Sequence, residues 1–268
     1  MNYKFERGTM FRAIDTHCHL NLKAFEYDVK DVIERTLKNG IEAIVVGINF
    51  ETSKKAIDLA KRFSGIYAAV GLHPYKIGNR DWRSELLQIS DLINTHKVVA
   101  IGEIGFDLHE VEENEVKTTI EIQQRAFDFF IQEAKKNKKP LIIHTRDAKS
   151  QTLSALTLLK KNRVKGVWHC YSSNLTDAKK AIDAGLLIGF TGLITYDRSY
   201  DNVITKIPLD KIVVETDAPF LSPAPLRGKR NEPSNVLYVV SQIAKLLGRD
   251  EESIAKQLYE NAKKLFNI

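Results

Sequence analysis

The segment at residues 11–19 reads Phe11-Arg12-Ala13-Ile14-Asp15-Thr16-His17-Cys18-His19, a short apolar run that ends in a His-x-His pair. On an extended strand, residues i and i+2 point to the same face. The side chains of His17 and His19 are therefore expected to aim two imidazoles at one point from a rigid element. We expect Cys18, between them, and Cys170, beside His169, to point away from the histidine side chains and to be packing residues.

The rest of the chain repeats this kind of short apolar run, each separated from the next by an amphipathic segment. The predicted strands are 12–16, 42–47, 66–71, 97–102, 140–144, 165–169, 186–190 and 211–215. In the longest amphipathic segment, 115–137, the residues Phe127, Phe130, Ile131 and Ala134 share one helical face. Strands that alternate with helices pair in parallel, and strands that are apolar throughout are buried on both faces.

This alternation predicts a single-domain (β/α)8 TIM barrel, for which a length of about 250 residues is typical. The runner-up is an open doubly wound sheet, but no Gly-x-Gly-x-x-Gly turn follows the first strand. We expect residues 1–11 to be an N-terminal extension and residues 12–268 to form the barrel. Ser234 and Gly248 are predicted to cap one late helix, and 251–266 to form the last.

The composition indicates a cellular compartment but does not identify a binding partner. The net charge is +6, which is compatible with a polyanionic substrate, although composition alone favours a solvated lysine-rich surface. The two cysteines, Cys18 and Cys170, are too few for a disulfide framework and indicate a reducing, cytoplasmic environment. We expect no membrane span, because no run of 18 apolar residues occurs, and no secretory leader.

Histidines and carboxylates gather where the predicted strands end. The residues in these positions are His17, His19, His73, Glu103, His144, His169 and Asp217. In a (β/α)8 barrel all strand ends meet on one face, where active sites form. Buried charges and imidazoles are costly unless they are paired or bind a metal. The pattern therefore predicts a metal-dependent hydrolase. His96, before the fourth strand, is expected on the surface, and His109 in a loop near the active face.

Longer motifs surround these residues and carry a family resemblance. They are Ile14-Asp15-Thr16-His17-Cys18-His19-Leu20, Val70-Gly71-Leu72-His73-Pro74, Ala100-Ile101-Gly102-Glu103-Ile104-Gly105-Phe106-Asp107, Ile143-His144-Thr145-Arg146-Asp147-Ala148, Trp168-His169-Cys170-Tyr171-Ser172, Glu215-Thr216-Asp217-Ala218-Pro219-Phe220-Leu221 and Arg227-Gly228-Lys229-Arg230-Asn231-Glu232-Pro233. From Ala13 onward the chain resembles the TatD-like metal-dependent hydrolases of the amidohydrolase superfamily. The resemblance implies a TIM barrel, a dinuclear metal site and nuclease activity, chiefly on DNA.

The resemblance also implies a ligand set. One metal ion would be held by His17, His19 and Asp217, the second by His144 and His169, and Glu103 would bridge the two. A carboxylate can span two ions roughly 3.5–4 Å apart. Some related barrels use a carbamylated lysine as the bridge, and Glu103 argues against those branches. Nitrogen and oxygen donors suit Zn²⁺, Mn²⁺ or Mg²⁺.

Asp217 and Glu103 are the expected catalytic residues. A water held between two metal ions has a lowered pKa and acts as a nucleophile at neutral pH. Asp217 is placed both to bind metal and to accept the proton of that water. Hydrolysis of a phosphodiester fits this layout, which predicts a deoxyribonuclease and, within that class, favours a 3′-to-5′ exonuclease.

Three residues are predicted to grip the substrate phosphate. His73 and Arg146 stand at strand ends without a metal assigned to them, and both can donate to phosphate oxygens. Arg227 lies in the segment 222–231, which holds three cations within four positions and is stiffened by prolines. We therefore expect a nucleic acid substrate, and we expect no obligate protein partner.

Two alternatives keep the barrel, and the first of them also keeps the metals. The first is a deacylase acting on aminoacyl-tRNA, or a hydrolase of small amides or esters. The second, a non-catalytic binding protein, is disfavoured because no ligand position is lost. The sequence departs from many relatives at Pro74-Tyr75 and at Leu108-His109. Neither departure touches the ligand set, although both could alter the grip on substrate.

Overall fold

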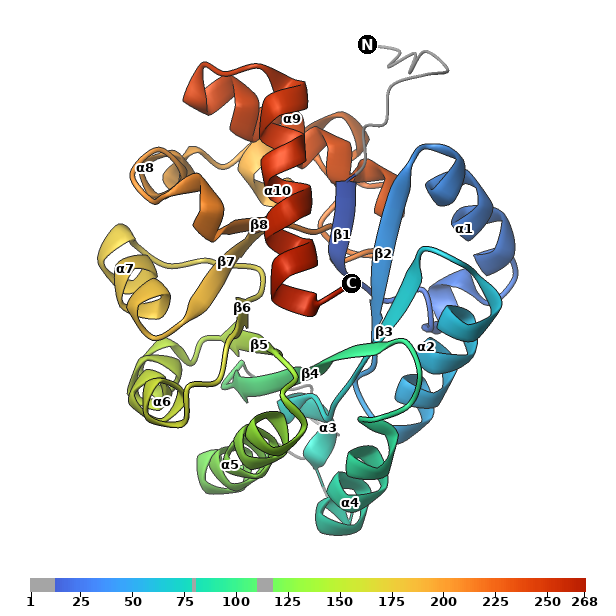
Figure 1. Ribbon diagram of the computed structural model, residues 1–268, viewed down its shortest axis with the longest axis vertical. Helices are drawn as coiled ribbons and strands as arrows, with labels where there is room; N and C mark the ends of the chain where they lie inside the picture. Colours follow the sequence, from blue (N-terminus) through green and yellow to red (C-terminus); the bar gives the residue numbers. More distant parts are fainter. Residues whose placement is uncertain (1–12, 79–80, 110–117) are drawn as a thin grey trace.

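Eight parallel strands form a nearly closed barrel with the helices packed around it (Figure 1). The structure is a computed structural model that describes residues 13–78, 81–109 and 118–268. The strands follow one another in sequence order from β1 to β8. This order confirms the predicted (β/α)8 TIM barrel over the doubly wound sheet. The predicted extension at residues 1–11 lies outside the described residues.

The strands are β1 (Ala13–Cys18), β2 (Ile41–Val46), β3 (Ile66–Val70), β4 (Val98–Asp107), β5 (Leu141–Arg146), β6 (Gly166–Trp168), β7 (Leu186–Phe190) and β8 (Ile212–Val214). The α-helices are α1 (Val29–Lys38), α2 (Phe50–Arg62), α3 (Pro74–Ile77), α4 (Trp82–Leu92), α5 (Ile120–Asn137), α6 (Lys149–Asn162), α7 (Leu175–Asp183), α8 (Asp201–Ile204), α9 (Val236–Leu247) and α10 (Glu251–Phe266). Short 3-10 turns are η1 (Lys23–Phe25), η2 (Gly192–Thr195), η3 (Arg198–Tyr200), η4 (Leu209–Lys211), η5 (Ala224–Leu226) and η6 (Pro233–Asn235).

Strand β4 differs most from its predicted range, 97–102, because it continues to Asp107. The prediction placed Glu103 just beyond the end of this strand. In the structure the ladder to β5 continues, with Gly105 opposite His144, after a shift of register between Ile101 and Ile104. Irregularities of this kind re-aim side chains near active sites. Glu103 therefore lies within the strand and not beyond its end.

The helix limits follow local chemistry. Helix α10 spans the predicted residues, and the Gly248 cap of α9 is confirmed by its left-handed backbone, φ 60°. Ser234 was wrong as the N-cap of α9. The capping residue is Asn235, because residues 233–235 form the turn η6 first. Among the described residues, no helix is long and apolar enough to cross a membrane.

The core has two layers, and the inner one is closed at one end by α10. Inside the barrel, residues such as Ile14, Ile44 and Ile142 pack with Phe266 of α10. Asn261 of α10 donates hydrogen bonds to two backbone carbonyls near the start of β8. The helix crosses in front of the strands in Figure 1. Since α10 covers the amino ends of the strands, the open face lies at their carboxyl ends.

The first and last strands meet through backbone and side-chain contacts. An isolated parallel bridge joins Cys18, the last residue of β1, to Ala218, which follows β8. The buried carboxylate of Asp15 accepts hydrogen bonds from the backbone N–H and the hydroxyl of Thr216, at 2.8 and 2.5 Å. Thr16 donates to the carbonyl of Val214 at 3.1 Å. These contacts hold the two ends of the barrel wall in register.

Replacing Asp15 by alanine is expected to lower the free energy of unfolding by on the order of 3 kcal/mol, because buried donors of Thr216 lose their acceptor. Urea denaturation measures the change. Asp58→Ala, at an exposed aspartate of α2, is the control and should stay within about 0.5 kcal/mol of the parent. Equal effects of the two substitutions would contradict a closing role for Asp15.

Candidate metal centre

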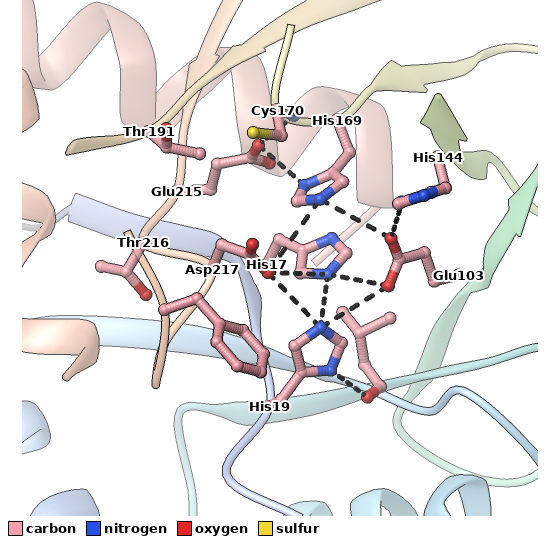
Figure 2. Close-up of polar contacts among 12 residues, drawn as sticks. His17, His19, Glu103, His144, His169, Cys170, Thr191, Glu215, Thr216 and Asp217 are labelled. Atoms are coloured by element: carbon pink, nitrogen blue, oxygen red, sulfur yellow. Dashed lines mark hydrogen bonds and ion pairs between the residues drawn. The ribbon is translucent and has the colours of Figure 1, made fainter. Parts of the chain in front are cut away.

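His17 and His19 point toward each other at the carboxyl end of β1 (Figure 2). Their Nε2 atoms lie 3.1 Å apart, and the rings meet edge to face with centroids 4.8 Å apart. Both residues are buried. The structure thus brings the two imidazoles to one point, as the alternation along a strand predicts.

Glu103 from β4 faces two groups of imidazoles at once. Its Oε2 atom lies 3.5 Å from the Nε2 atoms of both His17 and His19. Its Oε1 atom lies 2.6 Å from His144 Nδ1 and 3.7 Å from His169 Nε2. The carboxylate stands between the two pairs in Figure 2. This is the placement that a bridging ligand needs.

Asp217 completes the cluster from beyond β8. Its Oδ1 atom lies 3.4 Å from His19 Nε2, 3.7 Å from His17 Nε2 and 4.0 Å from His169 Nε2. The backbone N–H of Asp217 donates to the carbonyl of His17 at 2.9 Å. The junction between β1 and β8 therefore sets the carboxylate beside the histidines of the first strand.

The donors fit a divalent cation. His19 Nδ1 lies 3.0 Å from the carbonyl of Val46, so that nitrogen carries the proton and the lone pair stands on Nε2. That lone pair faces the imidazole of His17 at 3.1 Å. His17, His19 and the carboxylates around them would hold such a cation. The described residues that could hold ions form four groups: His17, His169 and Asp217; His17, His19 and Glu103; Glu103, His144 and His169; and His73, Asp107 and His144.

The fourth group is a poor ion site, because neither nitrogen of His73 has a lone pair available for an ion. Its Nδ1 accepts a hydrogen bond from the backbone N–H of Tyr75 at 3.1 Å. The neutral ring therefore keeps its proton on Nε2, which lies 3.7 Å from Glu103 Oε1. Burial, and then the neighbouring His144, lower the pKa of His73 to about 3. The side chain is a neutral hydrogen-bond donor aimed into the centre.

Two carboxylates that the sequence reasoning missed stand behind the imidazoles. Glu215 Oε1 lies 2.8 Å from His169 Nδ1, and Asp107 Oδ2 lies 3.0 Å from His144 Nε2. Carboxylates in such places orient metal-binding histidines and fix their tautomer. Gly189 leaves room for Glu215, since a Cβ atom there would approach its Oε2 to 2.9 Å. Both residues belonged to motifs already singled out, and their acidic character was the available signal.

The charges of the cluster are set by mutual contact. Burial raises the pKa of Glu103 and of Asp217, but the surrounding imidazoles together lower it by more. The net pKa of each group is lowered, so both are ionised. For the histidines the balance is reversed. Burial lowers the pKa of His144 and His169, but the carboxylates around each ring, led by Glu103 for His144 and by Glu215 for His169, together raise it by more. The outcome is a pKa of about 9 for His144 and about 10 for His169.

A cavity of about 850 Å³ opens over the cluster. Arg146 and His73, both predicted to contact phosphate, line it. Arg227 does not belong to its described lining and stacks on Tyr196, 4.4 Å from the ring centroid. Its contact with phosphate stays a prediction. Arg230, in the same segment, forms an ion pair with Asp28.

The remaining cysteines and histidines divide between packing and the site. Cys18 is buried in the core, as expected, and donates to the carbonyl of Ile44. Cys170, expected to pack, is part of the cavity lining, and its N–H donates to Glu215. His96 is exposed as predicted. His109 lies 2.7 Å from Asp147 at the surface.

The barrel and the cluster of histidines and carboxylates at its carboxyl-end face define a metal-dependent hydrolase. The family model described as TatD related DNase matches residues 14–267, and the chain belongs to this TatD family. It is 38% identical over 257 residues to the uncharacterized metal-dependent hydrolase YabD of Bacillus subtilis, covering 95% of this chain and 98% of that protein. It is 31% identical to the uncharacterized metal-dependent hydrolase MJ1582 of Methanocaldococcus jannaschii, over 95% and 97% of the two chains.

The crystal structure of the TatD homologue YJJV from Escherichia coli K12 superposes with a TM-score of 0.88. The two proteins are 31% identical, and the match covers 97% of this chain and 100% of that one. The fold and the hydrolase class are therefore shared over nearly the whole length.

Cation binding is expected to release protons. With pKa values of about 9 and about 10, His144 and His169 are protonated at pH 7 in the cation-free protein, and both must lose a proton to bind metal. Apparent affinity for Zn²⁺ should therefore rise with pH up to about 10, where the second of these protons is lost. Calorimetry in buffers of different ionisation enthalpy measures the release. A heat that does not depend on the buffer would contradict this protonation state.

Glu215→Gln is expected to weaken Zn²⁺ binding by about 10- to 100-fold, because the neutral amide no longer holds the proton on His169 Nδ1. Competition with a chromophoric chelator measures the affinity. Glu34→Gln, at an exposed glutamate of α1, is the matched control. Unchanged affinity in the Glu215 variant would assign that carboxylate to packing alone.

Proposed function

We propose that this protein is a deoxyribonuclease that hydrolyses phosphodiester bonds with two bound divalent cations. The observation that carries the proposal is the placement of Glu103, with one oxygen toward His17 and His19 and the other toward His144 and His169. Zn²⁺, Mn²⁺ and Mg²⁺ all suit these donors. A cation pair at these residues would polarise water and neutralise charge on a phosphoryl group.

The side chains divide the work of hydrolysis among them. We assign the acceptance of the water proton to Asp217, whose lowered pKa keeps the carboxylate ionised at neutral pH. We assign the grip on phosphate to the Nε2–H of His73 and the guanidinium of Arg146, which line the same cavity. His144 and His169 are held in place from behind by Asp107 and Glu215.

The charge around the cavity supports a nucleic acid substrate. Lys23, Lys76 and Arg146 are part of its lining, and cations in such positions attract a phosphate backbone. A second, polar cavity of about 560 Å³ shares Thr145 and Ser172 with the first. Two adjoining cavities suit a substrate longer than one nucleotide. The free cysteines among the described residues fit a reducing compartment, and we infer a cytoplasmic location.

Asp217→Asn should lower kcat on single-stranded oligonucleotides by about 100-fold or more, because the amide cannot accept the proton. Assays with Mg²⁺, Mn²⁺ and Zn²⁺ on defined 3′- and 5′-labelled oligonucleotides measure turnover and direction. Asp58→Asn is the control. Parental kcat in the Asp217 variant would remove the assigned role, and turnover of aminoacyl-tRNA without turnover of DNA would replace the nuclease by a deacylase.

Arg146→Ala should raise KM for DNA and flatten its dependence on salt, because one phosphate contact fewer releases fewer counterions. Arg227→Ala is the informative comparison, since Arg227 stacks on Tyr196 away from the cavity lining. We expect the smaller change at Arg227. A larger change there would show that the segment 222–231 carries the main phosphate contact.

A further inference from the structure

Phe220 is an exposed aromatic residue in the wall of the cavity over the metal centre. Its exposed fraction is 53%, and the other strongly exposed large hydrophobic residues among those described are Tyr27 and Leu87. Of these three, Phe220 is the one found in the described lining of the metal-centre cavity. The largest buried side chains of this chain include five other phenylalanines. An aromatic face left open to a cavity marks a place for a ligand.

The backbone around Phe220 ties its ring to the metal centre. The N–H of Phe220 donates to the carbonyl of Asp217 at 2.9 Å. The buried side chain of Asn231 donates to the carbonyl of Phe220 at 2.7 Å and to that of Thr216 at 2.9 Å. The ring centroid of Phe220 lies 6.4 Å from that of His19. The phenyl ring is therefore placed by the same contacts that place the carboxylate of Asp217.

The cavity has an apolar wall around this ring and a charged floor. Leu22, Leu193, Pro219 and Leu221 belong to the lining with Phe220, and carbon makes up most of its exposed surface. The imidazoles and carboxylates of the metal centre form the polar part. A ligand that suits this cavity has a flat apolar group joined to an anionic one. At about 850 Å³ the cavity falls in the range of small-molecule sites.

We propose that Phe220 is a stacking platform for the nucleobase next to the phosphate that is cleaved. This inference rests on the proposed nuclease function and adds a base-binding subsite to it. Every base has a π-face, so the contact is tolerant of sequence. The subsite fixes the nucleotide by its base while His73 and Arg146 hold its phosphate.

The test compares Phe220→Ala and Phe220→Leu with the parent on two oligonucleotides. One carries a base at the nucleotide beside the cleaved bond, and the other has a tetrahydrofuran abasic unit there. On the base-containing substrate, KM of the alanine variant should rise by between about 5- and 100-fold with kcat nearly unchanged, the loss expected for one stacked base. The leucine variant should lose most of the same affinity, because it keeps apolar volume without a π-face. On the abasic substrate all three proteins should agree.

A binding measurement separates this inference from the proposed function. The probe is an oligonucleotide with 2-aminopurine at the same nucleotide and a phosphorothioate at the cleaved bond. Binding to the parent should quench the 2-aminopurine fluorescence, and binding to Phe220→Ala should not. Leu87→Ala, at an exposed leucine of α4, is the matched control for loss of surface hydrophobicity. Turnover of DNA without quenching, or equal KM changes on both substrates, would overturn the stacking role alone. If the parent neither cleaves DNA nor quenches the probe, the nuclease proposal is overturned together with the stacking role.

Discussion

The junction between β1 and β8 is the constraint on which the rest of the site depends. Asp15, near the start of the barrel, and Thr216, near its end, are separated by 201 positions and joined by two hydrogen bonds of a buried carboxylate. The same junction pairs Asp217 with His17 through the backbone. A TIM barrel needs closure of its wall, and in this chain closure also brings Asp217 beside the histidines at the carboxyl end of β1.

Within that frame the centre is a balance of opposite charges in a buried place. Two carboxylates, Glu103 and Asp217, are kept ionised by the imidazoles around them, and these imidazoles are held by further carboxylates, Glu215 and Asp107. Removing any one partner leaves the others buried without compensation, which is costly. The arrangement therefore favours a cation, since a cation supplies positive charge as the histidines give up their protons.

The fold could be predicted well from the local sequence pattern, and the errors of that prediction have physical causes. Each apolar run became a strand, because strands buried on both faces need continuous apolar sequence. Strand β4 was predicted too short, because its ladder to β5 continues to Asp107 only after a shift of register between Ile101 and Ile104, and apolar pattern does not show such a shift. Ser234 was one position from the true cap because Pro233 begins a 3-10 turn.

The sequence by itself determined which side chains meet at the barrel face, since strand ends in a parallel barrel converge wherever the strands stop. It also determined the type of chemistry, through the choice of imidazole and carboxylate. Tertiary structure alone decided which nitrogen of His73 carries the proton and that Arg227 stacks on Tyr196. It also decided that Asp107 and Glu215 lie behind the imidazoles of His144 and His169. Those outcomes depend on contacts between residues far apart in the chain, and local periodicity carries no information about such contacts.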